Sequence, residues 1–349
     1  MKTSSISTSA ISEATRLSLM KLQLKLADAQ KELSTGRLAD VGAALGSKTG
    51  QTVSLRQEYS RLQAITDTND LVSSRLDATQ ASLKSMAAGA QSFFNQLMAV
   101  RNSGTGGDVL KSQALSSLSS LTNTLNTTSN GVYLFSGINT DVKPVADYTL
   151  NPPSANKQAV DNAFLAAFGI SQSNPGVANI AAVDMQNFLD NDFAALFSPA
   201  SWSSTWSSAS DQNMRSRIST SELIETSINA NDAAIRKLTS ALTMVADLGG
   251  DQLGDAAYEK VLDTAIRTAK EAIDGLTGMQ ARVGATQTRV KSANERMSIQ
   301  KDIMTSHITK LEAVDPYEAA DKVSSLTTQI ETAYAMTARL QKLSLLDYL

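Results

Sequence analysis

A repeat of mainly apolar positions runs from Leu55 to Val100, with Glu58, Asn69 and Thr79 as the exceptions. The positions alternate three and four residues apart, and eleven of the fourteen are apolar. This spacing predicts the seam of a helix that packs along a helical partner. At ~1.5 Å per residue such a helix is roughly 70 Å long, which is far more than an ordinary globular domain needs. We therefore expect a helical rod.

A second rod is predicted from Tyr258 to Leu311, where apolar residues again lie on one seam. In four consecutive heptads the alternate seam position is polar. These residues are Gln280, Gln287, Asn294 and Lys301. Polar residues in a seam reduce stability and usually fix the register of the paired helices.

The two ends of the chain predict helices with unusually wide apolar faces. Residues 11–33 carry two apolar stripes, one through Leu22 and Leu26 and one through Leu17, Met20 and Leu24, and Gly36 is suited to end the helix. The last helix is expected to open at Asp315-Pro316. Burying a leucine contributes roughly 1.5–3 kcal/mol, so such faces favour contacts between copies of the chain. The residues expected at these contacts are Leu19, Leu22, Leu26, Leu33, Val323, Leu326, Ile330, Leu340, Leu343, Leu345, Leu346 and Leu349.

Shorter elements are predicted between these helices. Asp108 is expected to cap a helix that follows a glycine-rich turn, and another helix is expected over 229–248. Asn130-Gly131 is a strong turn signal before a strand over 132–135. The Gly- and Ala-rich segment 41–50 is expected to be a connector with little regular structure.

The segment from Ile138 to Arg217 differs in composition from the rest. It holds five of the six prolines, five of the eight phenylalanines and both tryptophans. We expect an inserted mixed α/β, β-rich domain, with helices near 158–168 and 180–197 and strands near 143–150 and 214–228. The fold class is thus mainly α, a long antiparallel coiled-coil rod built from both chain ends. The expected division is 1–52, 53–137, 138–228, 229–314 and 315–349.

Composition argues against several classes of function. The net charge is −3 and no run of basic residues occurs, so neither nucleic acid nor an anionic membrane is expected as a partner. The chain has no cysteine and a single histidine, His307, which we expect to be partly exposed on a helix. We expect no enzyme, no metal site and no cofactor. The amino end has no apolar stretch of the kind found in secretory signals, so we expect no cleavable signal peptide.

Trp202 and Trp206 allow two interpretations. They could stack on a sugar at the surface, which would make the chain a cell-surface carbohydrate binder, or they could seal the core of the inserted domain. The second is favoured.

Three motifs resemble the bacterial flagellin superfamily. They are the amino-terminal segment with Leu22, Leu26 and residues 32–37, the segment 283–290, and the apolar ending 343–349. The resemblance implies a structural protein of the bacterial flagellum, exported without signal cleavage and located outside the cell. It also implies end helices that pack into a coiled-coil tube of identical copies. An export chaperone, a hook-associated protein and flagellin are the implied partners.

Within the superfamily, residues 130–137 and the ending Leu-Ser-Leu-Leu-Asp-Tyr-Leu look more like the hook-filament junction class than like filament subunits. This resemblance implies an adaptor ring between hook and filament. Residues 224–249 are similar to filament flagellins of the alphaproteobacterial type, so a filament subunit is the alternative.

Overall fold

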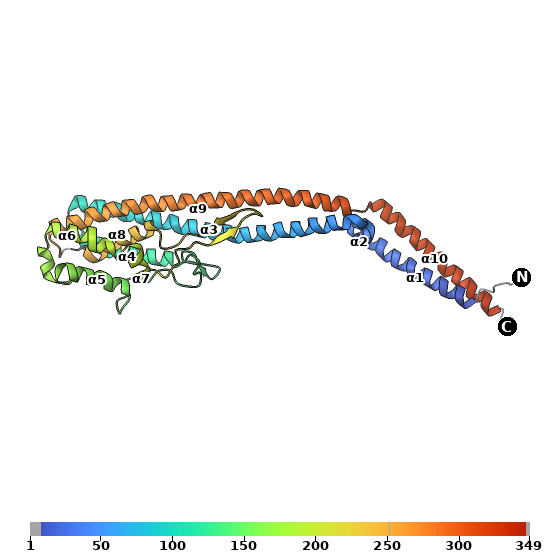
Figure 1. Ribbon diagram of the computed structural model, residues 1–349. Coiled ribbons are helices and arrows are strands. Elements are labelled where there is room, and N and C mark those ends of the chain that lie inside the picture. Colours follow the sequence, from blue (N-terminus) through green and yellow to red (C-terminus); the bar gives the residue numbers. More distant parts are fainter. Residues whose placement is uncertain (1–7, 251, 347–349) are drawn as a thin grey trace. The chain divides into compact units, whose positions relative to one another are not determined.

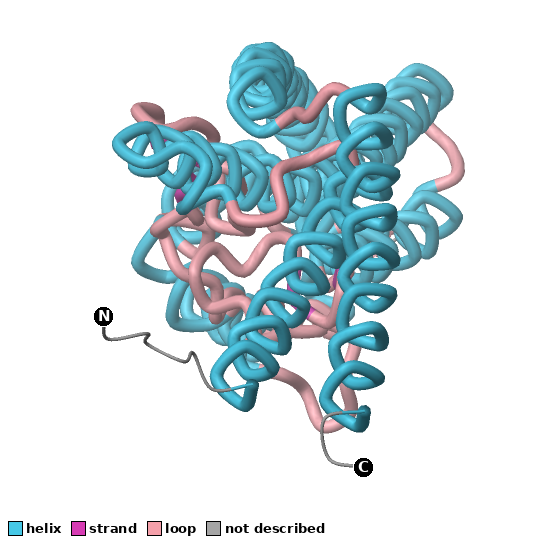
Figure 2. Tube along the Cα trace, turned by 90° about the vertical axis from the view of Figure 1, so that its right-hand side faces the viewer, coloured by secondary structure: helices cyan, strands magenta, loops and turns pink. Residues whose placement is uncertain are grey.

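The computed structural model describes residues 8–250 and 252–346 of the chain, and it divides into two compact units. One unit is Ile65–Arg296, and the other combines Met1–Ala64 with Met297–Leu349. Helices dominate both units, and strands are short pieces (Figures 1 and 2), so the predicted mainly α class is confirmed. The five-part division of the chain stays a prediction.

The elements follow one another as helix, rod, mixed segment, rod, helix. The helices are α1 (Thr8–Thr35), α2 (Val41–Leu45), α3 (Thr49–Ser103), α4 (Gly107–Leu125), α5 (Ala155–Phe168), α6 (Ala182–Phe188), α7 (Pro199–Thr205), α8 (Ala233–Leu248), α9 (Asp255–Glu312) and α10 (Pro316–Leu346). The strands form two antiparallel pairs, β1 (Thr128–Ser129) with β2 (Val132–Tyr133) and β3 (Arg215–Arg217) with β4 (Leu223–Glu225). Within the described ranges, no helix combines the length and apolar character that a bilayer span requires.

Three of the four polar residues of the α9 seam hold α9 against α3 in the unit 65–296, and the fourth, Lys301, lies in the other unit. Their side chains bond across the seam, joining Gln280 Nε2 to the carbonyl of Leu83 (3.3 Å), Gln287 Nε2 to Asp77 Oδ1 (2.6 Å) and Asn294 Oδ1 to Asn69 Nδ2 (2.7 Å). Residue numbers rise along one helix as they fall along the other, so the helices run antiparallel. Because each bond forms only in this register, the predicted role of the polar seam is supported by geometry.

Asn69 is the most buried of these polar groups, and its loss should be measurable. Its side chain is fully buried, and Nδ2 also donates to the carbonyl of Ile218, 2.8 Å away. Replacing Asn69 with alanine leaves the buried carbonyl of Ile218 and the half-buried Oδ1 of Asn294 without this donor, so we expect a loss of about 1–3 kcal/mol in the free energy of unfolding by urea. The exposed control Glu295→Ala should change it by less than about 0.5 kcal/mol. Equal stability of the two variants would contradict this role.

Two helix starts differ from expectation. Asp108 is not the N-cap of α4: Gly106 occupies that position with φ +96°, and Asp108 lies in the first turn. Only glycine adopts such a backbone readily, and this decides where the helix begins. The prediction of little regular structure over 41–50 is also wrong. This segment contains α2, a 3-10 turn over Gly46–Lys48 and the start of α3. Asp40 Oδ1 accepts from the Ala43 amide at 2.9 Å, and this cap stabilises the short helix α2.

The turn at Asn130-Gly131 is confirmed. Both residues have positive φ, +52° and +80°, as a two-residue hairpin turn requires. The strand that follows is shorter than predicted and ends at Tyr133. Leu134 and Phe135 leave the hairpin and are fully buried in the core.

The inserted segment is more helical than predicted. The helices expected near 158–168 and 180–197 correspond to α5 and to α6 followed by a π-helical turn at Leu189–Phe193, and the strands expected over 214–228 are β3 and β4. The prediction of a strand near 143–150 is wrong. In this segment only Val145 pairs, as a single bridge with Ser207. Pro144 has no N–H to extend the ladder. The regular structure of the inserted segment is therefore mainly helical, and the segment is not β-rich as predicted.

The core of this segment is a chain of packed rings. Trp202 and Trp206 stack with centroids 5.4 Å apart, and Tyr148 stacks on Trp206 at 5.2 Å. All three side chains are at most 3% exposed. The tryptophans therefore seal a core, as favoured, and a surface role in sugar stacking is excluded for this structure.

Candidate assembly interface

The candidate interface is built on the pairing of α1 with α10, which lie side by side in the unit that holds both chain ends (Figure 1). Gln23 Nε2 donates to the hydroxyl of Tyr334 at 2.9 Å, and Lys322 Nζ donates to Glu32 Oε2 at 2.9 Å. As numbers rise on α1 they fall on α10, so this pair is antiparallel too. Small or apolar side chains lie in its seam: Ala29, Ala319 and Leu326 are 0%, 1% and 8% exposed.

Six of the twelve predicted contact residues are buried or half-buried in the part of the chain that the structure describes. Leu326 is buried, and half-buried positions are held by Leu19, Leu22, Leu26, Val323 and Ile330. Leu33 is 41% exposed. Leu340, Leu343, Leu345 and Leu346 belong to α10, but their side chains, like Leu349 as a whole, lie outside the described residues. The role of all these residues in contacts between copies stays a prediction.

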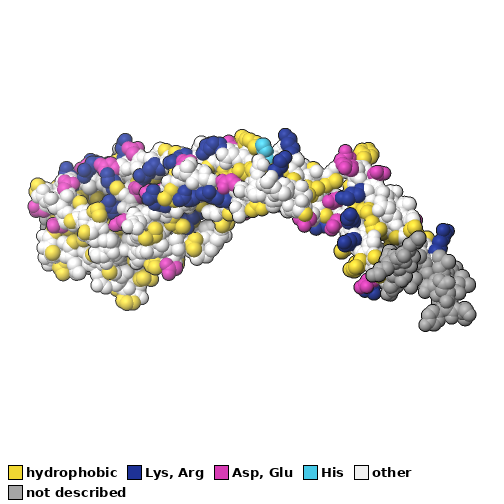
Figure 3. Space-filling model, turned by 45° about the vertical axis from the view of Figure 1, so that its right-hand side comes forward, with side chains coloured by type: hydrophobic (Ala, Val, Ile, Leu, Met, Phe, Trp, Pro, Cys, Tyr) yellow, Lys and Arg dark blue, Asp and Glu magenta, His cyan; other side chains and the backbone are white. Residues whose placement is uncertain are grey.

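The second apolar stripe of α1 has no cover in the monomer. We call Leu17, Met20 and Leu24 the outer stripe. Their side chains are 49%, 55% and 63% exposed, and their spacing of three and four residues puts them on one helix face. Figure 3 shows hydrophobic side chains on the surface of the terminal helix pair. Exposed apolar residues grouped on one face are typical of a contact surface.

Two short segments connect the terminal helices to the rods, and they pair with each other. They are residues 36–38, after α1, and residues 312–314, where α9 ends and α10 follows. Arg37 and Ala313 form an antiparallel bridge, in which the Leu38 amide donates to the carbonyl of Glu312 (2.9 Å) and the Val314 amide donates to that of Gly36 (3.1 Å). Gly36 has φ +65°, a backbone that side chains disfavour. We call this pairing the joint.

Two carboxylates at the joint are neutralised from the other half of the chain. Glu312 has a side chain only 1% exposed, and Arg56 donates to it through both Nε, 2.9 Å from Oε1, and Nη2. The hydrogen bond from Arg56 lowers the pKa of Glu312. At Glu32 the pKa is lowered by the hydrogen bond from Lys322. Both ion pairs thus favour the ionised, joined state.

Loss of the Arg56 side chain should loosen the joint. In Arg56→Ala the carboxylate of Glu312 keeps its burial but loses two donors, so the protection of the Leu38 and Val314 amides against hydrogen exchange should fall by about 1–3 kcal/mol. Arg61→Ala, which removes an arginine whose side chain is 58% exposed, is the matched control and should leave both amides unchanged.

The same pair predicts a pH dependence. Since the folded pKa of Glu312 lies below its usual value of 4.5, its stabilisation is complete above that pH. It is lost as the pH falls from there through the folded pKa. Amide protection at the joint should therefore decrease on acidification in the wild type and depend much less on pH in Arg56→Ala. Parallel pH curves for the two proteins would rule out this pair as the cause.

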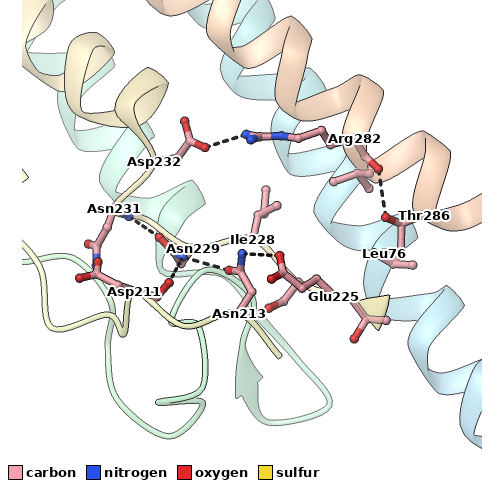
Figure 4. Close-up of a pocket in the computed structure, with 13 residues that line it drawn as sticks. Leu76, Asp211, Asn213, Glu225, Ile228, Asn229, Asn231, Asp232, Arg282 and Thr286 are labelled. Atoms are coloured by element: carbon pink, nitrogen blue, oxygen red, sulfur yellow. Dashed lines mark hydrogen bonds and ion pairs between the residues drawn. The ribbon is translucent and has the colours of Figure 1, made fainter. Parts of the chain in front are cut away.

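A polar cavity of about 310 Å³ lies in the unit 65–296 (Figure 4). Its polar side chains largely bond to one another. Arg282 donates to Asp232 (2.7 Å), Asn229 to Asn213 (2.9 Å) and Asn231 to Asp211 (2.7 Å). The cavity wall thus ties the start of α8 to α9, and the geometry favours a structural role over a ligand site.

The outer stripe and the two carboxylates at the joint are not among the residues that the sequence predicts for the interface. The outer stripe was visible as one of two equivalent apolar stripes, but the sequence gives no sign of which one α10 covers. Glu32 and Glu312 carry no local signal, because their partners Lys322 and Arg56 lie far away in the chain.

The model of the bacterial flagellin N-terminal helical region matches residues 6–140, and that of the bacterial flagellin C-terminal helical region matches residues 266–349. Together they span more than half of the chain. No curated protein sequence matches it.

Two solved structures are similar. A protein described as flagellar hook-associated, from Vibrio parahaemolyticus, is 10% identical with a TM-score of 0.52, and the match covers 76% of this chain and 97% of that one. At this identity the likeness shows a common fold. The crystal structure of Bacillus cereus FlgL is 13% identical with a TM-score of 0.47, covering 74% of this chain and 98% of the other.

Proposed function

Because this chain belongs to the bacterial flagellin family, we propose that it is a structural subunit of the flagellum that joins hook to filament through its terminal helices. The observation that carries the assembly role is the outer stripe, whose three apolar side chains are half exposed although the seam beside them is packed. Covering this stripe with a neighbouring copy would remove apolar surface from water, which favours association.

The junction role, as opposed to a role along the filament, is supported by sequence resemblance. Residues 130–137 and the ending 343–349 are more similar to junction proteins than to filament subunits. In this proposal the copies form a ring or tube outside the cell. Each ring contacts a neighbouring hook-associated protein on one side and flagellin on the other, after export with a chaperone and without cleavage. The protein acts by packing and not by catalysis.

A deletion strain tests the placement. If the chain is the junction subunit, cells that lack it should keep their hooks and secrete flagellin into the medium as monomers. Immunogold labelling of intact wild-type flagella should then mark one site next to the hook. Label along the whole shaft, together with loss of the filament protein itself in the deletion strain, would support the filament subunit instead.

A further inference from the structure

An open pocket of about 380 Å³ lies at the joint and is lined by groups that donate hydrogen bonds. Its walls come from Arg37, which follows α1, from α3 and from α9. The lining residues are Arg37, Arg56, Tyr59, Ser60, Thr305 and Ile308. This volume is within the range of pockets that hold small ligands or single side chains.

The charges in this pocket do not balance. Arg56 is engaged by Glu312, which accepts from two of its nitrogens. Arg37 lies close enough to Glu312 to lower the pKa of that carboxyl, but its guanidinium makes no hydrogen bond or ion pair with the part of the chain that the structure describes. One carboxylate thus faces two guanidinium groups, and a net positive charge remains.

The hydroxyl groups of the pocket are also unused. Those of Tyr59, Ser60 and Thr305 make no hydrogen bond to the described residues. The Arg37 guanidinium by itself carries five N–H donors. Together with the three hydroxyl groups it makes the pocket rich in hydrogen-bond donors and positively charged. The only apolar wall is Ile308, which is 8% exposed. Such a set matches a ligand with several acceptor oxygens and a negative charge.

We propose that this pocket binds an oxyanion, either a carboxylate or a phosphate group, with Arg37 as its principal contact. A planar guanidinium offers two parallel donors, which suit the two oxygens of either group. The site belongs to the monomer, so it does not depend on the proposed place in the flagellum. A bound anion would contact residues on both sides of the joint and would stabilise the joined state.

The test is a titration of the full-length monomer followed by the ¹⁵Nε–¹Hε resonances of its arginines. Inorganic phosphate is added in one arm and glutarate, which carries the carboxylate of a glutamate side chain, in the other, with chloride adjusted to hold the ionic strength constant. We expect saturable shifts at Arg37 and Arg56 and none at the exposed Arg61. Saturation with glutarate alone indicates an acidic protein side chain as the natural ligand, and saturation with phosphate alone indicates a free phosphate or phosphate ester.

Two variants sharpen the result. Arg37→Gln should weaken binding, read at Arg56, by roughly tenfold or more, as loss of a charge-assisted hydrogen bond implies. Arg37→Lys keeps the positive charge and should weaken anion binding less than Arg37→Gln does. An unchanged helical circular dichroism spectrum shows that each variant is folded. Absence of saturable shifts with both anions, or equal binding by Arg37→Gln, would overturn the proposal.

Discussion

Replacing Leu17, Met20 and Leu24 together with serine is expected to abolish assembly while leaving the monomer folded. The three side chains are 49–63% exposed in the monomer, so their loss removes little packing within it. Between copies, each apolar side chain contributes roughly 1.5–3 kcal/mol when fully buried, and about half of that remains to be gained from a half-exposed one. Three such residues amount to several kcal/mol per copy. The critical concentration for assembly should therefore rise by about 100-fold or more.

The measurement is sedimentation of purified protein at increasing concentration, with circular dichroism of the unsedimented fraction. A matched control replaces two exposed polar residues of the same helix, Lys21 and Lys25, with serine. The control should assemble like the wild type. If the triple variant also assembles at the wild-type concentration, the outer stripe is not a contact between copies.

The second large effect is expected for Trp202→Ala. This indole is fully buried, lies 5.4 Å from Trp206 and donates from Nε1 to Asn231 Oδ1 at 3.0 Å. Its removal creates a large cavity and leaves the half-buried Oδ1 of Asn231 with one donor fewer. We expect the free energy of unfolding of the unit 65–296 to fall by about 3–5 kcal/mol in urea titrations followed by circular dichroism.

Trp202→Phe is the matched comparison, because it keeps a ring in the stack and loses mainly the N–H. It should cost less than the alanine variant. Alanine and phenylalanine variants with wild-type stability would mean that the ring stack does not hold this region together.

The rods could be predicted from sequence because their signal is local and repeated. The spacing of Leu76, Leu83 and Leu97 on α3 depends only on helix geometry, and all three are buried where the seam predicts. The inserted segment could not be predicted equally well. The sequence predicts a strand near residue 145, but a strand needs a paired neighbour, and among the described residues this segment forms a single bridge, between Val145 and Ser207.

At the candidate interface, too, the local sequence does not predict which residues are covered. Leu22 and Leu24 are chemically identical, two residues apart on one helix. Leu22 is half-buried, and Leu24 is 63% exposed. Which of the two stripes on α1 is covered depends on the position of α10, which joins α1 through Lys322–Glu32 and Tyr334–Gln23. Contacts between segments so far apart in the chain have no local pattern from which to predict them.

The proposed assembly requires that the outer stripe be covered when copies associate, and the absence of cysteine from the chain makes this measurable. A single cysteine in Met20→Cys, 55% exposed as methionine, can be compared with one in Val183→Cys on α6, where valine is 64% exposed. Both should react readily with a maleimide in the monomer. In isolated flagella, position 20 should react at least about tenfold more slowly while position 183 stays reactive. Equal and rapid labelling of both positions in flagella would contradict the account.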